Sequence, residues 1–236
     1  MSFLKAAWKN LALINYEIDP SVLQKYLPAG TELDFWQDKC YVSLVGFLFH
    51  DTRVLGQRIP FHIDFEEVNL RFYVKRFEDG AFKRGVVFIK EIVPKRAIAL
   101  IANLLFKEHY QTLKMSHSFL ESEDSCLFTY NWSTKNHNNS IAIETAKTAI
   151  PIEIGSEAEF ITEHYFGYTK FNSAKTFEYE VTHPRWNQFE VIGYTMDVDF
   201  ENNYGEDFNF LKDLKPISVL LAEGSRITVE NKRLIR

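Results

Sequence analysis

Apolar residues recur along this chain in short runs separated by turn residues, which is the pattern expected of strands. Residues 41–49 form a nearly continuous apolar run bounded by polar residues, which predicts a strand buried on both faces. Residues 65–77 and 82–92 flank the dipeptide Asp79-Gly80, which favours a hairpin turn. Further strands are predicted at 8–16, 119–150, 176–182 and 189–200, with a turn at 135–139 and a closing pair of strands around Gly224.

Helical spacing interrupts these strands in only a few places. Asp19 before Pro20 fits an N-cap followed by proline at the first helical position, and Pro94 suits the first turn of another helix. Ser156 and Glu159 have the spacing of a capping box. The predicted helices are 20–26, 95–106, one that starts at 156, and a short one near 206–213. Strands dominate, about three helices interrupt them, and there is no regular β-α-β alternation. This pattern predicts one α+β domain over 1–236 that is mainly antiparallel β.

Composition narrows the class of protein. Hydrophobic residues make up 46% of the chain and aromatic residues 15%, enough for a wide core. The formal net charge of -5 argues against nucleic acid as a partner. Cys40 and Cys126 are expected to be buried free thiols, since two cysteines make no disulfide framework. No apolar run is long enough to span a bilayer and no secretory segment is recognisable, so we expect a cytoplasmic protein that does not enter a membrane.

One strand carries an unusual alternation. Glu67, Asn69, Arg71 and Tyr73 point to one side of the predicted strand, while positions 68, 70, 72 and 74 are all apolar. The polar side is either the wall of a cavity, where Arg71 binds a carboxylate, or a solvated surface. The hairpin turn brings 82–92 back alongside this strand, and Glu91 is therefore a candidate partner for Arg71. We predict a ligand site that contains all five residues.

Several segments occur in an order that is specific as a set. They are Trp8-x-Asn10-Leu11, Leu27-Pro28-x-Gly30 with Leu33-Asp34, residues 41–47, Phe65-x-Glu67-x-Asn69-Leu70-Arg71, Arg84-Gly85-Val86-Val87-Phe88 and His183-Pro184-x-Trp186. Together they resemble the YqjF-like family, a domain of unknown function, over essentially the whole chain. That family is more distantly similar to the acetoacetate-decarboxylase-like superfamily. The resemblance implies a partly open, β-barrel-like antiparallel sheet wrapped around a cavity.

The same resemblance raises the question of a catalytic lysine. The decarboxylases carry a Schiff-base lysine in a Pro-Lys-Lys segment after a helix, and here the corresponding residues 106–115 contain no such segment. Pro94-Lys95-Arg96 has a similar composition but lies at the other end of the helix. Acetoacetate decarboxylase activity is therefore not expected.

Two classes of function remain open. The first is a protein that binds a small organic acid or apolar metabolite without Schiff-base chemistry. The second is a lyase-like or hydrolase enzyme that uses Glu67 or residues behind the helix. Those catalytic candidates are Lys107, Glu108, His109, Tyr110 and Lys114, although a helix end whose His and Lys satisfy the last carbonyls explains the segment equally simply. No metal motif or cofactor fingerprint is recognisable, a small molecule is the expected partner, and the sequence is compatible with a homodimer.

Overall fold

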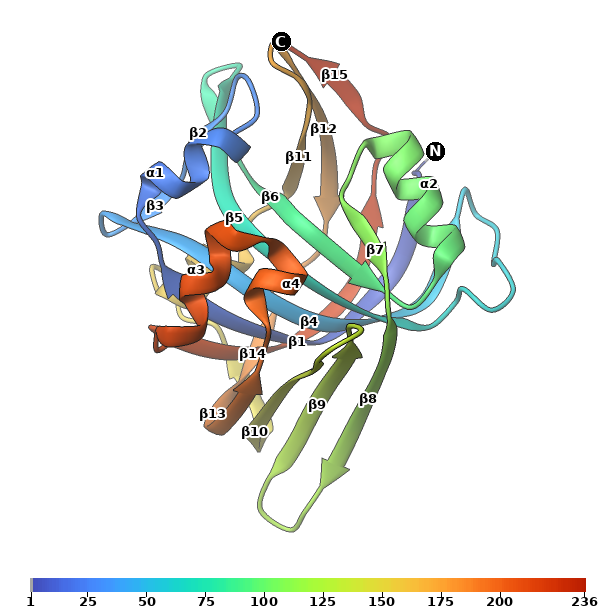
Figure 1. The fold of residues 1–236 in the computed structure, drawn as a ribbon, viewed down its shortest axis with the longest axis vertical. Coiled ribbons are helices and arrows are strands. Elements are labelled where there is room, and N and C mark those ends of the chain that lie inside the picture. The colour runs from blue at the N-terminus through green and yellow to red at the C-terminus, as the bar shows by residue number, and fades with distance from the viewer. Residues whose placement is uncertain (1) are drawn as a thin grey trace.

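The computed structural model describes residues 2–236 of the chain. Seven of its strands pair edge to edge, and the last strand pairs with the first, so that they form a ring (Figure 1). Val181 pairs with Val229 to close this ring. Every pairing in the ring is antiparallel except β11 with β6. In ring order the strands are β12 (Lys175–Thr182), β11 (Phe166–Asn172), β6 (Ala81–Val93), β5 (Phe65–Glu78), β4 (Lys39–Val54), β1 (Leu4–Glu17) and β14 (Ser218–Val229).

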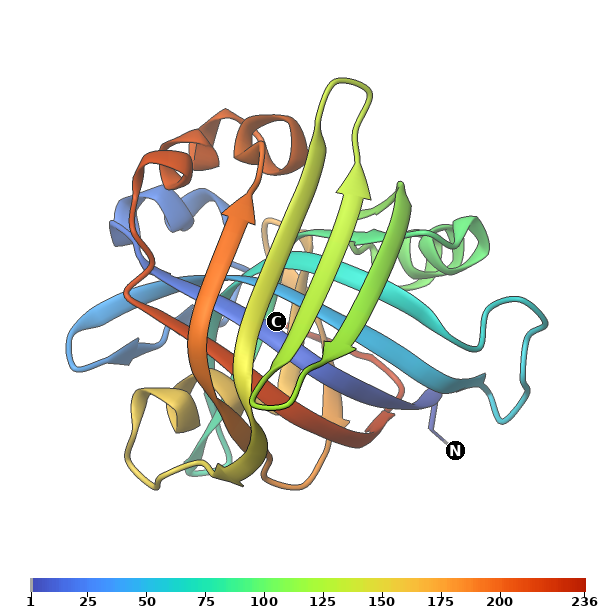
Figure 2. The same ribbon diagram turned by 90° about the horizontal axis from the view of Figure 1, so that it is seen from below.

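A second group of strands continues the sheet beyond the ring. From β14 the order runs through β13 (Asn187–Asp197), β10 (Asn138–Pro151), β9 (Cys126–Ser133) and β8 (Lys114–Glu121). Figure 2 shows the yellow-green strands β8 to β10 crossing over the blue strands β1 and β4 at a steep angle. The outer face of the ring is therefore covered by a second layer of strands, which is the orthogonal way of packing sheets.

These layers create two apolar cores. Side chains on the outer face of the ring, such as Leu70 and Phe72, pack with Phe128 and Trp132 of the covering layer. A separate cluster lies on the inside of the ring. Because both faces of β4 are covered, every residue from 40 to 47 is buried, and the predicted burial of this strand on both faces is confirmed.

The helices are short and lie at the margins of the sheet. Asp19 Oδ1 accepts a hydrogen bond from the Ser21 amide at 2.8 Å, and Ser156 Oγ accepts one from the Glu159 amide at 3.2 Å, so both predicted caps are confirmed. No helix within residues 2–236 combines the length and hydrophobicity needed to cross a bilayer. The helical segments are α1 (Pro20–Leu23), η1 (Gln24–Tyr26), α2 (Arg96–Phe106), α3 (Glu157–Thr162), α4 (Phe200–Tyr204) and η2 (Glu206–Asp213).

Four short strands complete the structure: β2 (Glu32–Leu33), β3 (Phe35–Trp36), β7 (Tyr110–Thr112) and β15 (Arg233–Ile235). The predicted hairpin is confirmed, since β5 and β6 are antiparallel partners on either side of Asp79 and Gly80. The mainly antiparallel, partly ring-shaped fold is also as predicted. Cys40 and Cys126 are both buried and free, as expected.

Two local predictions were wrong. Gly224 does not separate two strands but lies inside the continuous strand β14, with φ +81°, where a Cβ would come within 2.2 Å of the Trp8 carbonyl oxygen. The glycine allows close contact with β1, so the strand continues through it instead of turning back. The strand predicted over 189–200 ends at Asp197, because Asp199 Oδ1 accepts a hydrogen bond from the Asn202 amide at 3.0 Å and begins α4.

Candidate functional site

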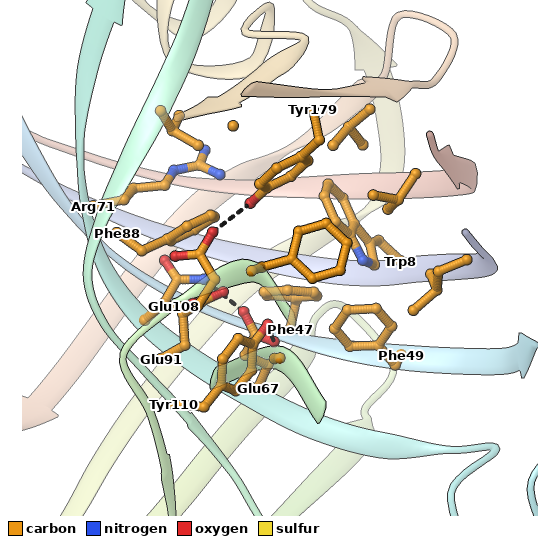
Figure 3. Close-up of a pocket in the computed structure, with 18 of the residues that line it drawn as sticks. Trp8, Phe47, Phe49, Glu67, Arg71, Phe88, Glu91, Glu108, Tyr110 and Tyr179 are labelled. Atoms are coloured by element: carbon orange, nitrogen blue, oxygen red, sulfur yellow. Dashed lines mark hydrogen bonds between the residues drawn. The ribbon is translucent and has the colours of Figure 1, made fainter. Parts of the chain in front are cut away.

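A cavity of about 130 Å³ lies inside the ring, and α2 lines part of it. Figure 3 shows its two ends: carboxyl, phenol and guanidinium groups gather on one side, while Trp8, Phe47 and Phe49 lie on the other. Strands β1, β4, β5, β6, β11, β12 and β14 all contribute lining residues. The closed ring thus brings together side chains from both ends of the sequence.

The polar face of β5 points into this cavity. Glu67, Asn69 and Arg71 line it, and they are only 2%, 1% and 8% exposed. The alternative of a solvated face was therefore wrong, because ring closure covers this side. Tyr73 is also buried but does not line the cavity, and its hydroxyl is 2.7 Å from Ser43 Oγ. Three of the four predicted β5 residues thus face the same cavity.

A bulge in β6 brings Glu91 into the cavity. Leu70 lies opposite Lys90, but Arg71 lies opposite Phe88, so Ile89 has no partner in β5. Because this extra residue reverses the alternation, Phe88 and Glu91 both line the cavity and Lys90 does not. Glu91 lies opposite Asn69, not Arg71.

The expected ion pair between Glu91 and Arg71 is absent, because Glu91 lies opposite Asn69 and the residue opposite Arg71 is Phe88. Within residues 2–236, Arg71 has no carboxylate ion pair. Its Nη2 donates a hydrogen bond of 3.4 Å to the Ile161 carbonyl, and its Nε has no partner. The guanidinium also lies 5.6 Å from the centre of the Tyr73 ring. Arg71 is thus a buried cation whose neighbours do not neutralise it directly.

Some catalytic candidates in the segment after α2 line the cavity, and the others lie on the surface. Glu108 lines the cavity, and its Oε1 accepts hydrogen bonds from Thr169 Oγ1 at 2.5 Å and Tyr179 Oη at 3.1 Å. Lys107, with φ 56°, ends the helix in the left-handed conformation. Lys107, His109 and Lys114 are exposed and do not line the cavity. Of the catalytic candidates behind the helix, these three therefore lie outside the cavity.

The side chain of Asn103 holds Tyr110 in place through two hydrogen bonds to the Tyr110 main chain. Asn103 of α2 accepts a hydrogen bond from the Tyr110 amide at 2.7 Å and donates one to the Tyr110 carbonyl at 2.9 Å. The Tyr110 hydroxyl then donates to Glu67 Oε2 at 3.3 Å, while Asn69 Nδ2 donates to Glu67 Oε1 at 3.0 Å. Helix α2 therefore positions an acid–phenol pair in the cavity wall.

Three buried carboxyl groups dominate the electrostatics. Burial raises the pKa of Glu67 and of Glu108 from 4.5 to about 7. The pKa of Glu91 is raised well above its ordinary value, first by burial and then by the charges of Glu108 and Glu67. These groups therefore share protons at neutral pH, and a protonated carboxyl donates a hydrogen bond where a carboxylate can only accept one.

His164 also lines the cavity, and sequence reasoning missed it. Its Nε2 lies 3.2 Å from Asp34 Oδ2, which also accepts a 2.6 Å hydrogen bond from Arg84 Nε. Asp34 belongs to the Leu33-Asp34 motif, but no spacing in the sequence links it to a histidine 130 residues away.

Five buried polar atoms of the cavity lining have no hydrogen-bond partner within residues 2–236: Trp8 Nε1, Asn69 Oδ1, Arg71 Nε, Glu91 Oε2 and His164 Nδ1.

The types of side chain limit the chemistry of the site. In the part of the chain that the structure describes, no group of three or more His, Cys, Asp or Glu side chains is arranged to hold a metal ion. None of the residues that line the cavity within 2–236 is a lysine. The arrangement offers a guanidinium, proton-sharing carboxyls, phenols and a histidine, which suit anion binding and proton transfer.

Comparison with known proteins places the chain in a family. A family model, DUF2071, described as "Uncharacterized conserved protein (COG2071)", matches residues 5–226. The chain is a DUF2071 protein. This DUF2071 protein is 23% identical over 188 residues to the uncharacterized protein YqjF of Bacillus subtilis (strain 168). The aligned region covers 78% of this chain and 74% of YqjF.

Solved structures share the fold at low sequence identity. Acetoacetate decarboxylase from Legionella pneumophila aligns with a TM-score of 0.65 and 14% identity, over 99% of this chain and 87% of that one. The enduracididine biosynthesis enzyme MppR complexed with pyruvate aligns with a TM-score of 0.66 and 13% identity, over 99% and 91%. The DUF2071 protein therefore has an acetoacetate-decarboxylase-like fold, as its sequence motifs predicted.

Proposed function

We propose that this DUF2071 protein binds a small organic acid in the cavity, with the carboxylate of the acid on Arg71. The observation that carries the proposal is the state of that guanidinium: it is 8% exposed, lines the cavity, and has no carboxylate partner within residues 2–236. A buried, unpaired cation is costly, and a bidentate carboxylate is the ligand that its geometry matches best.

The neighbouring glutamates adjust the charge that an anion meets. At neutral pH their raised pKa values keep part of the cluster protonated, so Arg71 is not surrounded by three full negative charges. Glu91 Oε2 has no partner and, when protonated, donates a hydrogen bond to an oxygen of the ligand. The cluster therefore favours a ligand with a carboxylate and a second oxygen nearby.

Cavity size and shape limit the ligand further. A cavity of about 130 Å³ is close to the roughly 150 Å³ that holds one benzene molecule in an engineered protein. An acid of pyruvate size fits this volume, and the aromatic end suits a short apolar tail. The solved structure of MppR with pyruvate supports the same class of ligand in a similar fold. Because no lysine lines the cavity within residues 2–236, we propose that binding is noncovalent.

Isothermal titration calorimetry with pyruvate tests the proposal directly. We expect saturable binding by the wild type, and no binding of pyruvamide, which has the same shape without the charge. Arg71→Met should weaken pyruvate binding by about tenfold or more, since it removes a charge-assisted bidentate contact. Arg226→Met is the matched control, because Arg226 is exposed and lies outside the cavity. Equal affinity of wild type and Arg71→Met for pyruvate would contradict the proposal.

A further inference from the structure

We propose that His164, oriented by Asp34, is a general base in this cavity and that the protein catalyses keto–enol proton transfer on a bound 2-oxo acid. This inference rests on the proposed binding of such an acid to Arg71. It adds a catalytic residue, a positioning residue and a reaction to that function.

The first support is the hydrogen bond that fixes the histidine tautomer. Asp34 Oδ2 lies 3.2 Å from His164 Nε2 and accepts from Arg84 Nε at 2.6 Å. Hydrogen bonds from His164 and Arg84 outweigh the effect of burial and hold the pKa of Asp34 below its ordinary value, so Asp34 is a carboxylate. A carboxylate only accepts, and Nε2 must therefore carry the proton. In the neutral ring, Nδ1 is left with a free lone pair.

The second support is the surroundings of that lone pair. His164 lines the cavity, its side chain is 1% exposed, and its Nδ1 has no hydrogen-bond partner within residues 2–236. Tyr73 and Phe160 hold the ring, with centroids 4.7 Å and 5.1 Å away. A rigid imidazole with one nitrogen bound to a carboxylate and the other free is the arrangement that a general base requires.

The third support is the position of Arg71. The guanidinium of Arg71 and the ring of His164 both contact Tyr73, at 5.6 Å and 4.7 Å between centres. The pKa of His164 is lowered to about 4, first by burial and also by the charges of Arg84 and Arg71. A carboxylate bound to Arg71 offsets one of these positive charges. Binding of the acid therefore makes the histidine a stronger base at the moment when it is needed.

The proposed step is balanced within the site. His164 Nδ1 takes a proton from C3 of the 2-oxo acid, and the electron pair of that C–H bond forms the C2=C3 double bond. The carbonyl π pair takes the proton of the Glu91 carboxyl group, so the product is the enol, with an imidazolium and a carboxylate left behind. The reverse transfer restores the keto acid, and no oxidant or cofactor is consumed. Glu91 suits the acid role because its Oε2 is buried and without a partner within residues 2–236.

Deuterium exchange measures this step separately from binding. Pyruvate in D₂O should lose its methyl proton NMR signal faster with the wild-type protein than in buffer alone. His164→Gln should slow the catalysed exchange by about 100-fold or more, the scale of general base catalysis, while calorimetry still detects pyruvate. His62→Gln is the matched control, since His62 is only partly buried and lies outside the cavity. Binding of pyruvate without exchange by the wild type overturns this inference alone, whereas loss of both overturns the proposed function too.

The positioning role of Asp34 has its own spectroscopic test. In the wild type, ¹⁵N NMR should report His164 with a protonated Nε2 and an unprotonated Nδ1. Asp34→Asn should shift this tautomer balance and slow exchange, because an amide no longer dictates which nitrogen carries the proton. A protonated Nδ1 in the wild type would overturn the proposal, and this measurement does not depend on any variant folding.

Discussion

The ring of Tyr179 occupies the space that a side chain on Gly167 would need. The two residues are partners across β11 and β12, and a Cβ on Gly167 would lie 2.1 Å from Tyr179 Cζ. The Tyr179 hydroxyl donates a hydrogen bond to Glu108 Oε1 at 3.1 Å. Because Gly167 has no side chain, the Tyr179 ring can lie where its hydroxyl reaches the cavity.

Gly167→Ala should therefore displace Tyr179 and destabilise the protein by about 1–3 kcal/mol, the usual cost of overpacking. Chemical denaturation measures the loss. Gly193→Ala is the control, because a Cβ there meets nothing within 4 Å, and it should change stability by less than about 0.5 kcal/mol. Equal effects of the two substitutions would show that Gly167 is not required for packing.

Glu67 should make the stability of the protein depend on pH. Its pKa is raised from 4.5 to about 7 by burial, so the folded state holds the proton more tightly than the unfolded chain. The resulting contribution to stability is fully present below pH 4.5 and is lost as the pH rises through about 7.

Glu67→Gln should remove this loss, which amounts to at most about 3 kcal/mol from the size of the shift. Urea denaturation at several pH values between 4.5 and 8 should give a flatter profile for the variant than for the wild type. The exposed residue Glu123, changed to Gln, should leave the wild-type profile intact. A variant profile as steep as that of the wild type would mean that Glu67 is not the titrating group.

Asn103 should stabilise the cavity wall from outside the cavity. Asn103→Ala removes both hydrogen bonds to the Tyr110 main chain, and we expect a loss of about 1–3 kcal/mol in denaturation experiments. Leu104→Ala on the same helix is the control, since Leu104 is 70% exposed and should matter little. If both variants are equally stable, another contact holds Tyr110.

Borohydride should trap no keto acid on this protein. No lysine lines the cavity within residues 2–236, and Lys107 and Lys114 are exposed, so no lysine amine is desolvated next to a bound acid. After incubation with acetoacetate and reduction, peptide mapping should find every lysine unmodified, and acetoacetate should not be decarboxylated at an enzyme-like rate. A modified lysine that disappears in a Lys107→Arg or Lys114→Arg variant would restore Schiff-base chemistry.

Local features of this protein were accessible from the sequence because they depend on neighbours in the chain. The caps at Asp19 and Ser156 are side-chain hydrogen bonds to amides two or three residues away, and the alternation along β5 follows from strand geometry. The ordered family motifs also predicted the fold. Such signals need no knowledge of what lies across the sheet.

The site itself was decided by tertiary structure. Whether the face of Glu67, Asn69 and Arg71 meets solvent or a cavity depends on the closure of the ring, where β12 pairs with β14. The bulge at Ile89 brings Glu91 into the cavity, and no residue type marks that position in the sequence. His164 and Asp34 are 130 residues apart and meet only because the sheet curls around. Contacts between distant segments depend on packing across the whole ring, which a local pattern of residues does not contain.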